Sequence, residues 1–173
     1  MVNRQELTAI IEKDGGNNWW KPELFELKTK SLLPSELQIV SGPPKHGENY
    51  NCFVFAFGLQ GDTEFLGGKN PVQQEFVKHL ILNRILLPIE TPSAGDLVFY
   101  KNKGGEITHG GVMQDKDIVI SKWMWGPMTI HKLLDVPASF GDEISFFKSP
   151  EAKEIAQKYT AYKNTGIEIR PIS

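Results

Sequence analysis

Cysteine is nearly absent from this sequence: Cys52 is the single one among 173 residues. An internal disulfide and a zinc site built from several cysteines are therefore excluded. The sequence also has no large excess of charge of either sign: it has 19 Lys and Arg residues and 21 Asp and Glu residues, for a formal net charge of −2. A duplex-binding protein normally carries a basic face, so nucleic acid is not an expected partner.

Long apolar runs are missing as well. No run approaches the roughly 18 residues that would predict a membrane span. The first residues, Met1 to Glu6, do not have the positive-then-apolar layout of a secretory signal. We therefore expect a protein that is cytoplasmic as synthesised, or one that a dedicated secretion or lysis system exports.

What is present is the composition of an ordinary globular protein, with 40% hydrophobic and 23% charged residues. The length suits one domain with a real core. We expect a single domain over residues 1–173, with an N-terminal helix and wrapping segment over 1–47, a catalytic core over 48–148, and a C-terminal helix and tail over 149–173.

The N-terminal half predicts two short helices around an irregular stretch. Asn3 and Glu6 have capping-box spacing, which predicts a helix over residues 4–13. Residues 17–50, rich in Trp, Pro and Gly, are expected to wrap irregularly over the surface. The apolar run after Cys52 is compatible with a buried strand or a buried helix, and Asn51 as N-cap favours a helix beginning at Cys52.

The remainder predicts one longer helix, several strands and a last helix. Asn70 as cap and Pro71 in the first turn indicate a helix over 71–86. A helix is expected from Ser149-Pro150 to about Tyr162, ended by Gly166, and residues 167–169 could add an edge strand. The expected strands cover residues 96–100, 108–114, 118–123, 128–131 and 143–147. Helices first and strands later predict the α+β class with a mostly antiparallel sheet.

Cys52 at the head of a helix is a candidate nucleophile. Cysteine attacks carbonyl groups as the thiolate, and the unpaired N–H groups of a first helical turn favour an anion and can hold an oxyanion. The alternative is a free cysteine that serves as a small buried hydrophobe, which is the commoner situation.

His109 is the candidate base. It starts a predicted strand and is followed by Gly110 and Gly111, whose small size leaves room for a substrate. The alternative is a strand-end histidine in solvent. Cys52 and His109 lie on different elements and must meet in space, as Cys–His pairs usually do.

Three segments in order resemble NlpC/P60 and CHAP-type cysteine hydrolases. Residues 50–59, Tyr-Asn-Cys-Phe-Val-Phe-Ala-Phe-Gly-Leu, are similar to the Cys-bearing helix of that family. Residues 92–100 resemble its Pro-Gly-Asp-Leu-Val-Phe-Phe strand, and Thr-His-Gly-Gly-Val-Met over 108–113 resembles its Ser-His-Val-Gly-Ile-Tyr strand. The resemblance covers roughly residues 48 to 147 and implies a papain-like fold with a catalytic Cys52–His109 pair.

The family has a third polar residue, usually His, Asn or Gln, that orients the imidazole. The family spacing places it at Ser121, a departure from the pattern, and His131 is the other candidate. Lys122, one step beyond Ser121, is expected to face the other side of its strand. A second departure is Phe53, which stands where the family usually has a small residue after the cysteine and narrows the room beside the thiol.

Residues beside the pair are expected to bind the substrate: Tyr50, Asn51, Gly110 and Trp123. Trp123 and Trp125 alternate, so both are expected on one face of a strand, as the wall of a groove or as core residues. No metal site or cofactor is expected, because one cysteine and no His-x-x-x-His spacing make a poor zinc ligand set.

The resemblance implies a cysteine amidase or peptidase that works through an acyl-enzyme on cell-wall peptide, or on a protein target if the chain is a delivered toxin. The implied partners are a peptide, glycopeptide or acyl substrate, together with an immunity or other partner protein. Two alternatives stay open: an acyltransferase of the same fold, and an inactive NlpC/P60-like binding module.

Overall fold

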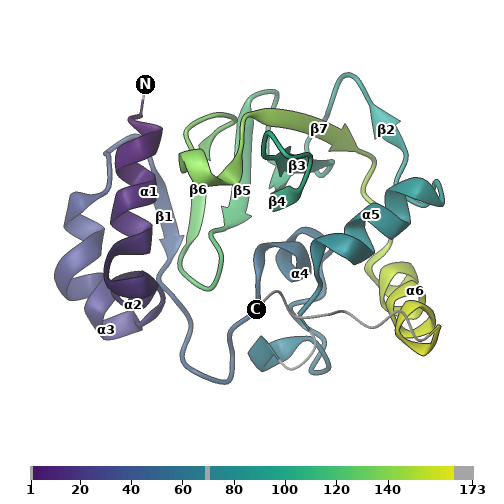
Figure 1. The fold of residues 1–173 in the computed structure, drawn as a ribbon, viewed down its shortest axis with the longest axis horizontal. Coiled ribbons are helices and arrows are strands. Elements are labelled where there is room, and N and C mark those ends of the chain that lie inside the picture. Colours follow the sequence, from purple (N-terminus) through teal and green to yellow (C-terminus); the bar gives the residue numbers. More distant parts are fainter. Residues whose placement is uncertain (1, 69–70, 166–173) are drawn as a thin grey trace.

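A seven-stranded antiparallel sheet is the framework of the computed structural model, which describes residues 2–68 and 71–165 (Figure 1). The strands lie in the order β1-β6-β5-β4-β3-β7-β2. Their bounds are β1 Gln38–Ser41, β2 Pro88–Ile89, β3 Leu97–Lys101, β4 Ile107–Met113, β5 Ile118–Lys122, β6 Met128–Lys132 and β7 Glu143–Phe147. The helices are α1 Arg4–Glu12, α2 Asn17–Trp20, α3 Pro22–Leu24, α4 Cys52–Ala56, α5 Gln74–Leu82 and α6 Ala152–Asn164. The expected α+β class is confirmed.

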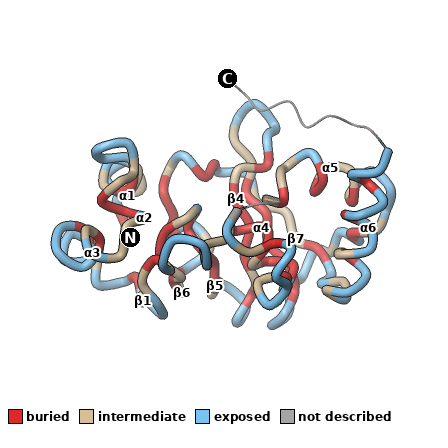
Figure 2. The backbone as a smooth tube through the Cα atoms, turned by 90° about the horizontal axis from the view of Figure 1, so that it is seen from below, coloured by how far each residue is buried: buried red, intermediate tan, exposed pale blue. Residues whose placement is uncertain are grey.

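Each face of this sheet has its own hydrophobic cluster. On what we call the first face, α4, α5 and α6 pack around Leu97 and Phe99 of β3. On the second face, α1, α2 and the 3-10 turn Ala138–Phe140 pack around Val98 and Tyr100 of the same strand. Successive side chains of a strand point to opposite faces, and all four residues are buried because both faces are covered. The buried positions accordingly follow the strands and α4 in Figure 2, whereas α3 has no buried residue.

Two of the three predicted helix starts with an asparagine cap are confirmed. The side chain of Asn3 accepts a hydrogen bond from the backbone N–H of Glu6, at the head of α1. The side chain of Asn51 accepts one from Val54 at 3.0 Å, so α4 begins at Cys52 rather than continuing a strand. In both places the side-chain oxygen satisfies an N–H group that the first helical turn leaves free.

The helix expected over residues 71–86 is shorter than predicted. α5 begins at Gln74, with Gln73 as N-cap, and ends at Leu82. Arg84 has a φ of 55°, which stops the helix, and Pro88–Ile89 then pairs with β7 as a strand. The apolar spacing in the sequence extends past the end of α5 because Leu86, which follows the helix, is buried in the same first-face cluster. The predicted cap Asn70 lies outside the described residues.

The prediction of an irregular segment over residues 17–50 is wrong in part. This stretch contains α2, α3 and β1, and β1 pairs with β6 at the edge of the sheet. Trp19 explains the order of the segment, because it is buried, stacks on Trp123 with ring centroids 5.8 Å apart, and donates to the carbonyl of Trp123. These elements are too short to show a hydrophobic period, so tertiary packing decides them.

The last predicted helix is confirmed with shifted ends, as α6 from Ala152 to Asn164. The helix stop at Gly166 and the edge strand over 167–169 lie outside the described residues. In the part of the chain that is described, no helix has the length and apolar character that a bilayer crossing requires.

Candidate functional site

Cys52 lies at the head of α4, which packs on β4 and β5. Its side chain belongs to the first-face cluster and is 5% exposed. The backbone groups of Gly110 on β4, of Cys52 and of Phe53 each act to lower the pKa of this thiol. Backbone N–H groups near a sulfur favour a thiolate, and could also stabilise an oxyanion formed on an acyl group attached there.

Burial opposes ionisation of this thiol and raises its pKa to about 11. The backbone N–H groups act in the other direction, as does the ammonium of Lys122. The thiol form therefore predominates at neutral pH, and Cys52 needs a proton acceptor to react as a nucleophile.

His109 lies on β4 with its ring toward the second face. Its register partner on β3 is Tyr100, with ring centroids 5.5 Å apart, and its ring stacks on Phe140 at 4.0 Å. The side chain is fully buried, and neither ring nitrogen has a hydrogen-bond partner among the described residues. Burial, together with the nearby His131, holds the pKa of His109 well below its ordinary value. The imidazole is therefore neutral at physiological pH.

The structure does not bring Cys52 and His109 together as a hydrogen-bonded pair. Gly110, the residue after His109, packs against Phe99 and Phe53 of the first face, so β4 directs His109 to the other side. Cys52 shares the first-face cluster with Phe53 and Phe99. The period-2 alternation of a strand separates the two groups, although their order along the chain fits the family pattern.

The two candidates for the third residue pair with each other. The Ser121 hydroxyl and His131 Nε2 are 2.8 Å apart, and His131 Nδ1 is 2.8 Å from the carbonyl of Lys132. Trp123 Nε1 donates to the Ser121 oxygen at 3.0 Å. Ser121 is therefore the donor to His131, whose other ring nitrogen carries the proton. Neither residue hydrogen-bonds to His109, and burial lowers the pKa of His131 to about 4.

Lys122 is the polar residue near Cys52 that sequence reasoning set aside. As expected, it faces the opposite side of β5 from Ser121, and this is the side of Cys52. The lysine is 2% exposed, its Nζ lies 5.2 Å from the centroid of the Tyr50 ring, and it donates to the carbonyl of Gly126. Burial lowers its pKa to about 7, while Cys52 acts to raise it. To predict from the sequence that Lys122 lies near Cys52, one would have to know which face of the sheet α4 covers.

The predicted substrate-binding residues have mixed placements. Tyr50 is half-buried beside Lys122, and the Gly110 N–H reaches Cys52. Asn51 uses its side chain to cap α4 and to donate to the carbonyl of Val72 at 2.8 Å. Trp123 is fully buried in the second-face cluster, so it is a core residue and not the wall of a groove.

Trp125 does not alternate with Trp123 on a strand as expected. β5 ends at Lys122, and residues 123–127 form a tight turn in which Met124 has a φ of 55°. Trp125 instead lines a mostly apolar cavity of about 720 Å³, together with Trp20, Pro22, Pro44, His46 and Asn49. Asn49 donates to the Trp125 carbonyl at 2.7 Å, which joins the segment before Cys52 to the turn after Lys122.

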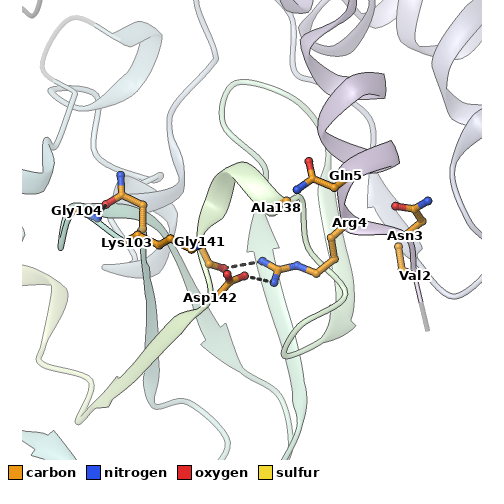
Figure 3. A pocket seen from close by; sticks show the side chains of 10 residues that line it. Val2, Asn3, Arg4, Gln5, Lys103, Gly104, Ala138, Gly141 and Asp142 are labelled. Atoms are coloured by element: carbon orange, nitrogen blue, oxygen red, sulfur yellow. Dashed lines mark hydrogen bonds and ion pairs between the residues drawn. The ribbon is translucent and has the colours of Figure 1, made fainter.

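A second cavity, of about 700 Å³, lies between the start of α1 and the loop before β7 (Figure 3). Arg4 crosses it to form an ion pair with Asp142, and also donates to the carbonyls of Val136 and Gly141. This arginine fastens α1 to the second face. Cys52 and His109 line neither of the two cavities.

Among the described residues, no group of three or more His, Cys, Asp or Glu side chains is placed to hold a metal ion. In the comparisons with known proteins, no family model, curated protein or solved structure matches this chain significantly.

Proposed function

We propose that this protein is a cysteine amidase or peptidase in which Cys52 forms an acyl-enzyme. The single observation that carries the proposal is the position of Cys52 as the first residue of the capped helix α4, against β4, where backbone groups including that of Gly110 favour the thiolate. This is the arrangement that acyl transfer to a thiol requires, because negative charge develops first on sulfur and then on the carbonyl oxygen.

The proposed family is the papain-like NlpC/P60 group of cysteine hydrolases. A Cys-bearing helix that packs on an antiparallel sheet supports this assignment, as do the three segments of similar sequence. The cavity at Asn49 and Trp125 is the proposed approach for substrate, since Asn49 lies three residues before Cys52. Its mostly apolar lining, with two tryptophans, suits an acyl or peptide group.

A specific observation also favours a second candidate, a binding module of the same fold without catalysis. The thiol is buried and its pKa is raised, and the predicted base His109 is on the other face. An acyltransferase of this fold would use the same thioester intermediate and differ only in the acceptor.

Intact-mass spectrometry with p-nitrophenyl acetate as acyl donor tests the proposal. We expect one acetyl adduct per chain on Cys52, release of nitrophenol, and loss of both in Cys52→Ala. Incubation with muropeptides and with amine acceptors then separates hydrolysis from acyl transfer. A wild-type protein that forms no adduct and cleaves no muropeptide would favour the binding module.

A further inference from the structure

Lys122 is a buried cation without a carboxylate partner in the described part of the chain. Its described contacts are the Gly126 carbonyl and the face of the Tyr50 ring. A buried lysine normally costs stability, because burial disfavours the charged form. Burial of Lys122 therefore lowers the stability of the fold, and a buried ionisable group of this kind is typical of a functional site.

The fold places this lysine on the same side of the sheet as Cys52. Tyr50, which contacts the lysine, packs against the first-face cluster and lies two residues before Cys52. β5 contacts α4, and Lys122 is the last residue of β5. Lys122 and Cys52 are close enough for each to influence the pKa of the other, whereas the ring of His109 contacts Tyr100 and Phe140 on the second face.

We propose that Lys122, and not His109, accepts the proton from the Cys52 thiol. This inference rests on the proposed function of Cys52 as a nucleophile. A neutral lysine amine is a competent general base, and its function requires a desolvated position such as this one. Since the pKa of Lys122 lies at about 7, a large fraction is already neutral at physiological pH.

The proposed step is balanced within the chain and the substrate. The Cys52 sulfur forms a bond to the acyl carbon while the thiol proton moves to Lys122 Nζ, and the carbonyl electrons form an oxyanion. The resulting ammonium returns the proton to the leaving amine as the carbon–nitrogen bond breaks. Water then attacks the thioester carbon and loses a proton to Nζ. As the carbon–sulfur bond breaks, Nζ returns that proton to the Cys52 sulfur, which restores the thiol and releases the acid.

A structural role is the alternative, in which Lys122 only closes the β5–β6 turn through Gly126. Two substitutions distinguish the roles, because methionine keeps the length without an amine and arginine keeps a charge that cannot accept a proton. Lys116→Met, at an exposed turn position, is the matched control.

The experiment follows Cys52 alkylation by iodoacetamide and acetylation by p-nitrophenyl acetate from about pH 6 to about pH 9. We expect a wild-type rise centred near neutral pH, and a loss of about tenfold or more near pH 7.5 in Lys122→Met and Lys122→Arg. Lys116→Met should follow wild type. Full activity of Lys122→Arg would assign a purely electrostatic role and overturn the inference.

His109→Leu separates this inference from the proposed function. If His109→Leu loses as much acetylation as Cys52→Ala does, while Lys122→Met stays active, then His109 is the base. In that case the inference about Lys122 fails and the proposed function of Cys52 stands. If wild type shows no acetylation, the proposed function fails, and the pH profile of alkylation still tests the Lys122–Cys52 coupling.

A direct titration covers the case in which the variants do not fold. NMR of ¹³C-labelled lysine in wild type should show Lys122 titrating near neutral pH, well below an ordinary lysine, because its amine is buried. A Lys122 that titrates like a surface lysine would overturn the inference.

Discussion

The two faces of the sheet treat their buried polar groups differently. On the second face, Ser121, His131 and Trp123 satisfy one another through hydrogen bonds, while His109 is buried among aromatic rings with no partner for either ring nitrogen among the described residues. On the first face, Cys52 and Lys122 are buried without a carboxylate among the described residues. A satisfied network stabilises a unique packing, whereas two ionisable groups without such partners are typical of a reactive site. Because Cys52 and Lys122 influence each other's pKa and the ring of His109 lies on the other face, the proposed chemistry is assigned to the first face.

The largest effect on stability is expected from Trp19→Ala on the second face. The side chain is 2% exposed, and its loss removes the stack on Trp123 as well as a hydrogen bond to the Trp123 carbonyl. Urea denaturation should show a loss of about 3 to 5 kcal/mol. Trp20→Ala is the matched control, since Trp20 is 36% exposed, and a comparable loss there would contradict the packing described.

The neighbouring glycines of β4 compare the two faces directly. A Cβ at Gly110 would lie 2.8 Å from the Phe99 ring on the first face. A Cβ at Gly111 would lie 2.8 Å from Val119 Cγ1 and 2.9 Å from the backbone oxygen of Ile120 on β5. We expect Gly110→Ala to cost about 1 to 3 kcal/mol, and Gly111→Ala to cost more because a backbone atom cannot move aside.

Thermal unfolding of Gly110→Ala and Gly111→Ala shows which of the two substitutions lowers stability more. Gly61→Ala is the control, because a Cβ there meets nothing within 4 Å. A larger loss of stability in Gly110→Ala than in Gly111→Ala would contradict the close approach of Gly111 to the backbone of β5.

Lys122→Met should change how stability depends on pH. Burial lowers the folded-state pKa of Lys122 to about 7 from 10.5, so the unfolded chain binds more protons between those values. The free energy of unfolding of wild type should therefore rise by about 1 to 2 kcal/mol between about pH 7 and about pH 9. Urea denaturation of Lys122→Met should show this rise removed; an unchanged rise would place its origin elsewhere.

His109→Leu should change the pH dependence of stability at lower pH. As with Lys122, the free energy of unfolding of wild type rises with pH, and the substitution should weaken that rise. The folded-state pKa of His109 is held below its ordinary value of 6.5, so the unfolded chain takes up a proton first as the pH falls. Stability conferred by the neutral imidazole is present above about pH 6.5 and declines below it, by about 1 kcal/mol at about pH 5.5.

His131 has a lowered pKa too, so the acid loss should shrink in His109→Leu without vanishing. Chemical denaturation at several pH values measures the slope, with His46→Leu in an exposed loop as control. An unaltered slope would indicate that the His109 ring is hydrated in solution.

The smallest effect is expected from Asp142→Asn at the edge of the second face. The Asp142 side chain is 63% exposed, so its ion pair with Arg4 is largely screened and should contribute less than about 0.5 kcal/mol. Arg4→Met should cost more, because the donors to the Val136 and Gly141 carbonyls are lost as well. Equal losses in thermal unfolding would mean that the ion pair alone fastens α1.

The sequence by itself determined the elements that local chemistry controls. Asn3 and Asn51 begin helices because their side chains satisfy free N–H groups within the next three residues, and this pattern needs no distant contact. Short apolar runs separated by turn residues likewise predicted β3 to β7, and helices followed by strands predicted the α+β class. α2, α3 and β1 were not predictable, because Trp19 and the edge of β6 order them from far along the chain.

Tertiary structure alone decided which polar groups meet. The order of segments correctly predicted that Cys52 heads a helix and that His109 lies on a strand, yet a one-residue step along β4 separates the faces of His109 and Gly110. The same step along β5 directs Ser121 to His131 and Lys122 toward Cys52. Side-chain direction in a strand depends on register and on which face a helix covers, and neither is written in the spacing of residues.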